Sequence, residues 1–173
     1  MSILPSDSNS PFPAAKSGGA DKVSGLNQPP RPSRFDAPEK FTVLVAEDDQ
    51  NDRSLLDQLL VSAGLASVRF VTSGDAVIDY LAGRGEYQDR QDHPFPHVLI
   101  LDLVLPRRHG LDVLAWMASH AEIPLCSVYV LTGSHDPELG RRAMSFGVAG
   151  FFQKPLSLAQ ISWILEDRMA LMY

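Results

Sequence analysis

The sequence predicts an α/β fold, a doubly wound five-stranded parallel sheet flanked by five helices. Short apolar runs alternate along the chain with segments whose apolar residues recur at helical spacing. This alternation is typical of a parallel sheet with helices on both faces. The clearest strand is 98–101, because it is too short for a helix, follows Pro96 and leads directly into Asp102. Since this run is apolar throughout, it fits a strand that is buried on both faces.

Each predicted helix has its own start or stop signal. Polar residues cap the first turns, because the first backbone N–H groups of a helix need an acceptor, and glycine often follows the last turn. The predicted strands are 41–46, 68–71, 98–101, 127–131 and 150–153. A helix is predicted after each strand. Its signals are, in chain order: Asn51 or Asp52 as cap and Gly64 at the end; Ser73 as cap and Gly83 at the end; Gly110 at the start; Asp136 as cap, Pro137 in the first turn and Gly147 at the end; and a capping box of Ser157 and Gln160.

Residues 1–40 differ in amino-acid composition from the rest of the chain. They contain seven of the thirteen prolines and seven serines, with few large apolar residues and no periodicity. Such a segment cannot bury enough apolar surface to offset the entropy lost on ordering. We therefore expect a disordered Pro/Ser-rich tail at 1–40 and one folded domain at 41–173.

Composition excludes several classes of protein. The net charge of −6 argues against a surface that coats nucleic acid. The single cysteine, Cys126, rules out an internal disulfide framework and fits a reducing compartment. No apolar run is long enough to span a membrane, and the N-terminus lacks the pattern of a signal peptide. We expect a cytoplasmic protein whose partners are neither nucleic acid nor membrane.

Four of the five predicted strands end in a side chain that can do chemistry. Glu47 and Asp48 follow the first strand, Asp102 the third, Thr132 the fourth and Lys154 the fifth. Because the carboxyl ends of parallel strands lie at one edge of the sheet, we expect these side chains to converge. Clustered carboxylates repel one another unless a cation neutralises them. Mg²⁺ prefers such oxygen ligands, so the pattern predicts a Mg²⁺ site.

The segments VLVAEDD, LILDLVLP, VLTG and GFFQKP resemble the signatures of the receiver domain of two-component response regulators. The resemblance covers roughly 41–169 and implies the flavodoxin-like strand order 2-1-3-4-5. It also implies that Asp102 accepts a phosphoryl group from a histidine kinase or phosphotransfer protein. The implied metal ligands are Asp48 directly, Glu47 through water, Asp102, and the backbone carbonyl of Val104. Thr132 and Lys154 would contact the phosphoryl oxygens, with Thr132 and Phe151 as switch residues.

A narrower resemblance is to stand-alone receivers that partner bacterial phytochrome kinases. It rests on GEY at 85–87, in a long loop, and on LTGSH at 131–135. Three positions depart from the family pattern: His109 replaces a common aspartate, Phe151 lacks a hydroxyl, and Val104 has no polar group to position an attacking water. None of these departures removes a phosphorylation residue, so we predict a stand-alone response regulator and not an enzyme.

Three other functions are alternatives. A phosphatase of the haloacid dehalogenase type needs a second aspartate two residues after the first, where this chain has Val104. A dinucleotide-binding protein would have a glycine-rich turn after the first strand, where this chain has Glu47 and Asp48. A receiver-like protein-binding module that acts without phosphorylation is the remaining alternative, and the complete acidic set argues against it.

The last helix carries the predicted interface. Trp163 lies opposite the apolar stripe of Ile161 and Leu165, together with Ala159 and Ala170, so we expect it to be exposed. Exposed tryptophan is enriched in interface anchors. The last helix and last strand are therefore the predicted face of a homodimer, and the alternative is a monomer in which Trp163 lies on its own helix.

Overall fold

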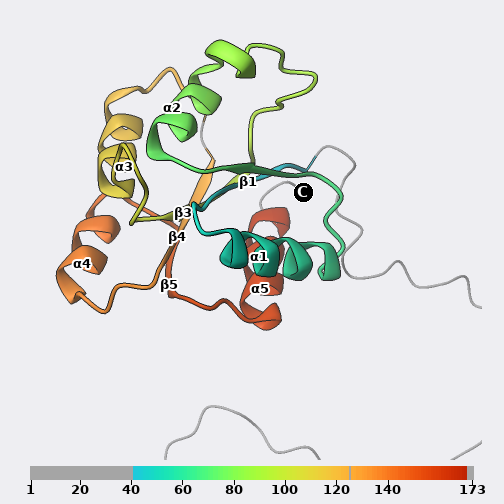
Figure 1. Ribbon diagram of the computed structural model, residues 1–173, viewed down its shortest axis with the longest axis vertical. Coiled ribbons are helices and arrows are strands. Elements are labelled where there is room, and N and C mark those ends of the chain that lie inside the picture. Colours follow the sequence, from blue (N-terminus) through green and yellow to red (C-terminus); the bar gives the residue numbers. More distant parts are fainter. Residues whose placement is uncertain (1–40, 125, 171–173) are drawn as a thin grey trace, which may run out of the picture. The chain divides into compact units, whose positions relative to one another are not determined.

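The computed structural model describes residues 41–124 and 126–170, so the expectation for the tail at 1–40 falls outside the described residues. Within them, five parallel strands form one sheet in the order β2-β1-β3-β4-β5, which confirms the predicted fold class (Figure 1). The strands are β1 Val43–Ala46, β2 Val68–Val71, β3 Val98–Asp102, β4 Ser127–Thr132 and β5 Gly150–Gln153. The α-helices are α1 Gln50–Ser62, α2 Gly74–Ala82, α3 Gly110–Ser119, α4 Pro137–Ser145 and α5 Leu158–Ala170, and a 3₁₀ turn, η1, spans Gly85–Tyr87.

The helices form a layer on each face of the sheet. Helices α1 and α5 cover one face, and α2, α3 and α4 cover the other (Figure 1). Successive residues of a strand point to opposite faces, so β3 sends Val98 and Ile100 toward α1 and α5, and Leu99 and Leu101 toward the other helices. All four side chains are buried. This explains why the strand is apolar throughout its length. None of the described helices is long and apolar enough to cross a membrane.

Most of the predicted helix caps are present, but the first one is wrong. Asp49 caps α1, and its Oδ1 accepts hydrogen bonds from the N–H groups of Asn51 at 2.8 Å and Asp52 at 3.0 Å. These two bonds lower the pKa of Asp49, the Asp52 bond most. The helix begins earlier than we expected because β1 leads into it through only three residues, 47–49. Asn51 and Asp52 therefore already lie in the first turn.

The remaining caps agree with the sequence signals. The hydroxyl of Ser73 accepts from the N–H of Ala76 at 3.2 Å, and Asp136 accepts from the N–H of Glu138 at 2.9 Å. Ser157 and Gln160 exchange backbone-to-side-chain hydrogen bonds, as a capping box requires.

Gly110 fixes the start of α3 against the end of β3. Its N–H donates to the carbonyl of Leu103 at 2.9 Å. A Cβ atom on Gly110 would lie 2.6 Å from the carbonyl oxygen of Asp102 and 2.7 Å from Cα of Leu103. Only glycine allows this approach, so the glycine helps to set the position of the Asp102 backbone.

We expect Gly110→Ala to lower the free energy of unfolding by on the order of 1–3 kcal/mol, because the added methyl group displaces the end of β3. Denaturant unfolding measures this change. Gly133→Ala is the matched control, since a Cβ there meets no atom within 4 Å, and its effect should stay within about 0.5 kcal/mol. Equal losses in the two variants would contradict the role given to the close approach at Gly110.

Candidate functional site

The sheet register brings the chemical side chains to one edge. Ala46 pairs with Leu101, so Glu47 and Asp102 follow as neighbours on β1 and β3. Thr132 pairs with Gln153, so Lys154 comes next on the β5 side, and its N–H donates to the carbonyl of Thr132 at 3.0 Å. The register therefore decides which side chains face one another across the edge.

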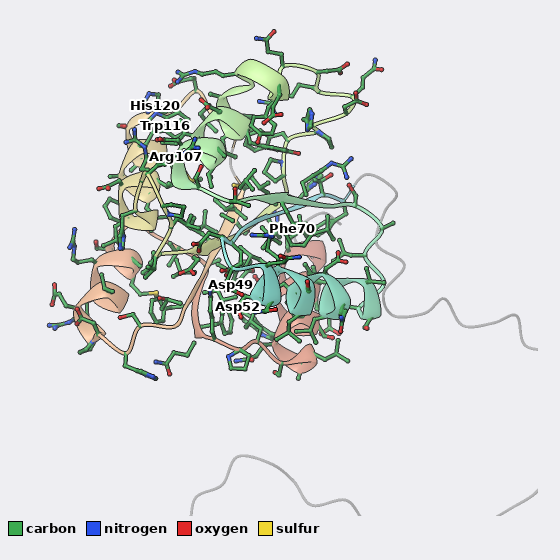
Figure 2. All side chains as sticks on the ribbon, viewed as in Figure 1. Asp49, Asp52, Phe70, Arg107, Trp116 and His120 are labelled. Atoms are coloured by element: carbon green, nitrogen blue, oxygen red, sulfur yellow. The ribbon has the colours of Figure 1, made fainter. Side chains whose placement is uncertain are left out.

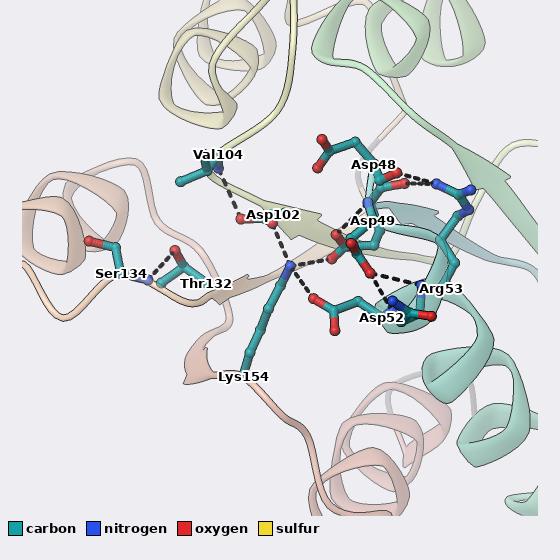
Figure 3. A network of polar contacts seen from close by, with 11 residues as sticks. Asp48, Asp49, Asp52, Arg53, Asp102, Val104, Thr132, Ser134 and Lys154 are labelled. Atoms are coloured by element: carbon teal, nitrogen blue, oxygen red, sulfur yellow. Dashed lines mark hydrogen bonds and ion pairs between the residues drawn. The ribbon is translucent and has the colours of Figure 1, made fainter.

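The ammonium of Lys154 lies among three carboxylates (Figure 3). Its Nζ is 2.6 Å from Oδ2 of Asp102 and 2.9 Å from Oδ2 of Asp52, and it donates a hydrogen bond to each. Nζ is also 2.5 Å from Oε2 of Glu47, in an ion pair that lacks hydrogen-bond geometry. One cation thus joins side chains from α1, β3 and the end of β1.

Burial and charge act on these groups in opposite directions. Burial raises the pKa of Glu47, although the neighbouring Lys154 ammonium opposes the shift. Burial alone would lower the pKa of Lys154, but its interactions with Asp102, Glu47 and Asp52 together raise it above the ordinary value. Lys154 therefore remains charged at physiological pH.

The carboxylates of Glu47, Asp48 and Asp102 form a set that fits a divalent cation. One oxygen of each lies within 4.8 Å of the others. Glu47 is 1% exposed and Asp102 is 4% exposed, while Asp48 is open to solvent. The buried Oε2 of Glu47 has no hydrogen-bond partner among the described residues. Three carboxylates beside a single ammonium, in an oxygen-only set with one open side, form the kind of arrangement that Mg²⁺ prefers.

The other predicted residues lie close to this cluster or at its border. The N–H of Val104 donates to Oδ1 of Asp102 at 2.9 Å, and the Val104 side chain is 55% exposed. Thr132 is completely buried, and its Oγ1 accepts from the N–H of Ser134 at 3.2 Å. Phe151 is half-buried and turns toward α4, since a Cβ on Gly140 would lie 3.5 Å from its ring.

Trp163 lies away from the acidic cluster. It projects from α5, is 49% exposed, and meets Tyr129 and Phe152 in edge-on ring contacts with centroids 6.1 Å and 6.0 Å apart. The predicted exposure is thus confirmed. The ring packs against rings on β4 and β5 and does not lie flat on its own helix, which is what the monomer alternative supposed. The side chain of Ala170 is outside the described residues.

Sequence reasoning missed two residues of the site. Asp52 appeared only as a candidate cap, yet its carboxylate contacts Lys154. Arg53 donates from Nη1 to the carbonyl oxygens of Glu47 at 3.1 Å and Asp48 at 2.6 Å. Figure 2 shows Asp52 beside Asp49 at the start of α1. No local signal in the sequence marks Asp52 as a partner of Lys154, because their contact joins residues that lie 102 positions apart.

Comparison with known proteins identifies relatives of this arrangement. The family model for the response regulator receiver domain matches residues 43–166. Response regulator Rcp1 from Synechocystis is 30% identical over 97 residues, which span 56% of this chain and 64% of Rcp1, less than two thirds of its length. The Mn²⁺-bound form of Rcp1 matches in fold, with a TM-score of 0.62, 24% identity, and coverage of 76% of this chain and 94% of that one.

Two further solved structures are similar. The bacteriophytochrome response regulator AtBRR has a TM-score of 0.65 and 28% identity, over 79% of this chain and 96% of that one. A response regulator in red light signaling of R. palustris has a TM-score of 0.62 and 31% identity, over 76% of this chain and 90% of that one. Each of these two alignments covers at least 90% of the other protein's chain, so the similarity extends over nearly the whole of each solved structure.

We expect Mg²⁺ to raise the thermal stability of the protein, because a ligand that binds only the folded state adds about 2.7 kcal/mol at a hundredfold excess over its Kd. Asp48→Ala should lose this response, and should be at least as stable as the wild type without Mg²⁺ because carboxylate repulsion falls. Thermal unfolding across a Mg²⁺ titration measures both effects. Asp57→Ala, which removes an exposed carboxylate from α1, is the control and should respond as the wild type does. Wild-type Mg²⁺ affinity in Asp48→Ala would refute the ligand role.

Proposed function

The chain belongs to the family of response regulator receiver domains. From this premise we propose that it is a response regulator that accepts a phosphoryl group on Asp102. The observation that carries the proposal is the burial of this carboxylate and its hydrogen bonds. It is 4% exposed at the end of the central strand, with Oδ2 held by Lys154 and Oδ1 held by the N–H of Val104. A histidine kinase or phosphotransfer protein would supply the phosphoryl group.

The proposed transfer forms a bond between a carboxylate oxygen of Asp102 and phosphorus, and breaks the bond from phosphorus to the donor. Lys154 is charged throughout and can compensate negative charge on the phosphoryl oxygens, with Thr132 as the second contact. Mg²⁺, when bound, neutralises the carboxylates and the phosphoryl group. Glu47, Asp48, Asp102 and the Val104 carbonyl would hold the ion, and the existence of an Mn²⁺-bound form of the relative Rcp1 supports a divalent cation as ligand.

Phosphorylation would act by shifting an equilibrium between existing conformations. In the present structure Oγ1 of Thr132 accepts a hydrogen bond from the N–H of Ser134, in the turn that leads to α4, and the O–H of the same hydroxyl can donate. A phosphoryl group on Asp102 would offer this O–H a charged acceptor. Thr132 would then turn toward the phosphoryl group and displace the turn before α4, and Phe151, which packs beside α4, would follow.

The proposed donor is a kinase of the phytochrome type. Two of the similar structures are named as a bacteriophytochrome response regulator and as a response regulator in red light signaling. Their identities of 28% and 31% with this chain support a shared class of partner.

The proposed output is association with a second copy through α5 and β5. A hollow of about 410 Å³ lies there, lined by Gly150, Phe151, Phe152, Ala159, Gln160 and Trp163. β5 is the last strand in the sheet order, so its outer backbone edge pairs with no strand of the described residues. A symmetric pair would cover both the hollow and Trp163 in an isologous contact.

We expect Asp102→Asn to abolish acid-labile phosphorylation by acetyl phosphate with Mg²⁺, because the amide is a far weaker nucleophile than the carboxylate. Intact-protein mass spectrometry measures the labelled fraction. Asp57→Asn makes the same chemical change on the exposed face of α1 and should be labelled as the wild type is. Undiminished labelling of Asp102→Asn would reject the assignment and favour a binding module that works without phosphorylation.

We expect the wild type to dimerise when beryllofluoride and Mg²⁺ mimic the phosphoryl group, and Trp163→Ala to weaken that dimer, since the indole would be buried between the subunits. Sedimentation velocity with and without the mimic measures this. Val61→Ala, which trims a side chain on α1 that is 59% exposed, is the control. A wild type that stays monomeric, or a dimer indifferent to Trp163→Ala, would defeat the proposed interface.

A further inference from the structure

We propose that Asp52 is a positioning residue that anchors the Lys154 ammonium independently of the metal ligands and of the phosphoryl acceptor. The proposal rests on the proposed function of Asp102. Its starting point is the number of partners around Lys154. An ammonium has three N–H donors; the Lys154 ammonium donates to Asp52 and Asp102 and forms an ion pair with Glu47, all within 2.9 Å.

Two of these three partners have other proposed tasks. Glu47 and Asp102 belong to the set whose oxygens converge within 4.8 Å as candidate metal ligands, and Asp102 is also the proposed phosphoryl acceptor. Asp52 is not in that set. When a cation and a phosphoryl group engage the other two carboxylates, Asp52 is the partner that can keep its hydrogen bond to Lys154.

The Asp52 carboxylate is held by the architecture around it. Its own N–H donates to Oδ1 of Asp49 at 3.0 Å, which fixes it in the first turn of α1. The neighbouring Arg53 guanidinium ties that turn to the carbonyl groups of Glu47 and Asp48. Figure 3 shows the Asp52 side chain directed from this turn toward the Lys154 ammonium. A carboxylate presented by a fixed helical turn can preorganise a long, flexible lysine side chain.

The anchor has a consequence for the proposed reaction. Lys154 must give up its bond to Asp102 and direct that donor at a phosphoryl oxygen. With Asp52 in place, the ammonium can make this exchange while one of its other donors stays bound. Without Asp52, the Lys154 side chain has no carboxylate partner among the three that is free of a proposed metal or phosphoryl role. The four-carbon side chain is then less restrained beforehand, so it loses more rotamer freedom when the phosphoryl group binds.

The test is the affinity of the full chain for beryllofluoride in the presence of Mg²⁺, measured by calorimetry. We expect Asp52→Ala to bind beryllofluoride about three- to tenfold more weakly than the wild type. A loss of this size lies between the effect of removing an exposed ion pair and that of removing a charge-assisted hydrogen bond. Asp52→Asn, which keeps an acceptor oxygen but loses the charge, should fall between Asp52→Ala and the wild type. Asp52→Glu, which keeps the carboxylate, should recover affinity relative to Asp52→Ala.

Two controls separate positioning from a general effect of charge or folding. Asp57→Ala removes the same charge from the same helix and should leave the affinity for beryllofluoride unchanged. In a Lys154→Ala background, Asp52→Ala should have no further effect, because a residue that acts through Lys154 has nothing left to act on. The Mg²⁺ affinity of Asp52→Ala should stay within about twofold of the wild type, since only screened charge is lost.

Each outcome decides between defined alternatives. Unchanged or tighter beryllofluoride binding by Asp52→Ala overturns the anchor role, as does an equal loss in the Lys154→Ala background. A wild type that binds Mg²⁺ but not beryllofluoride would instead reject the proposed phosphoryl site itself. The same loss in Asp57→Ala would show that net charge, not the contact with Lys154, sets the affinity.

Discussion

The ion cluster around Lys154 is the contact on which the rest of the site depends. One positive charge compensates carboxylates from three segments that are distant in sequence: Glu47 after β1, Asp52 on α1 and Asp102 on β3. Two of these carboxylates are almost completely buried. A buried carboxylate is stable as an anion only where a partner charge and hydrogen bonds offset the loss of water. Lys154 therefore stabilises this edge of the sheet by compensating part of the carboxylate charge. The negative charge that remains can be neutralised by a divalent cation.

The backbone makes this cluster possible before any side chain is considered. Parallel pairing places the carboxyl ends of β1, β3 and β4 side by side, and the contact of Gly110 with the Asp102 carbonyl fixes where β3 ends. The short connection from β1 into α1 then places Asp52 within reach of Lys154. Because the donors and acceptors sit at the ends of rigid elements, the proposed site needs little reorganisation before it meets a phosphoryl group.

The proposed conformational change would extend from the site to α4, which lies in the helix layer on the other face of the sheet from α1. Thr132 lies at the end of β4, where its Oγ1 accepts from the N–H of Ser134 in the turn before α4, and Phe151 on β5 packs against that helix. Any change in the partner of Thr132 acts on a connection that already joins β4, α4 and β5. The hollow beside Trp163 lies along the same strand, so the proposed switch and the proposed interface share β5.

The sequence by itself determined the elements, their order and the residues at the strand ends, because these follow from local rules. An uninterrupted apolar run such as 98–101 requires burial on both faces, and the signals at Ser73, Asp136 and Ser157 satisfy backbone groups within a few residues. Tertiary structure decided what depends on distance between segments. The position of Asp49 as cap follows from how β1 meets α1, and the contact of Asp52 with Lys154 spans 102 residues, a separation at which no local pattern carries information. The partners of Thr132 and of the Trp163 ring became visible only once β4, β5 and α5 were packed together.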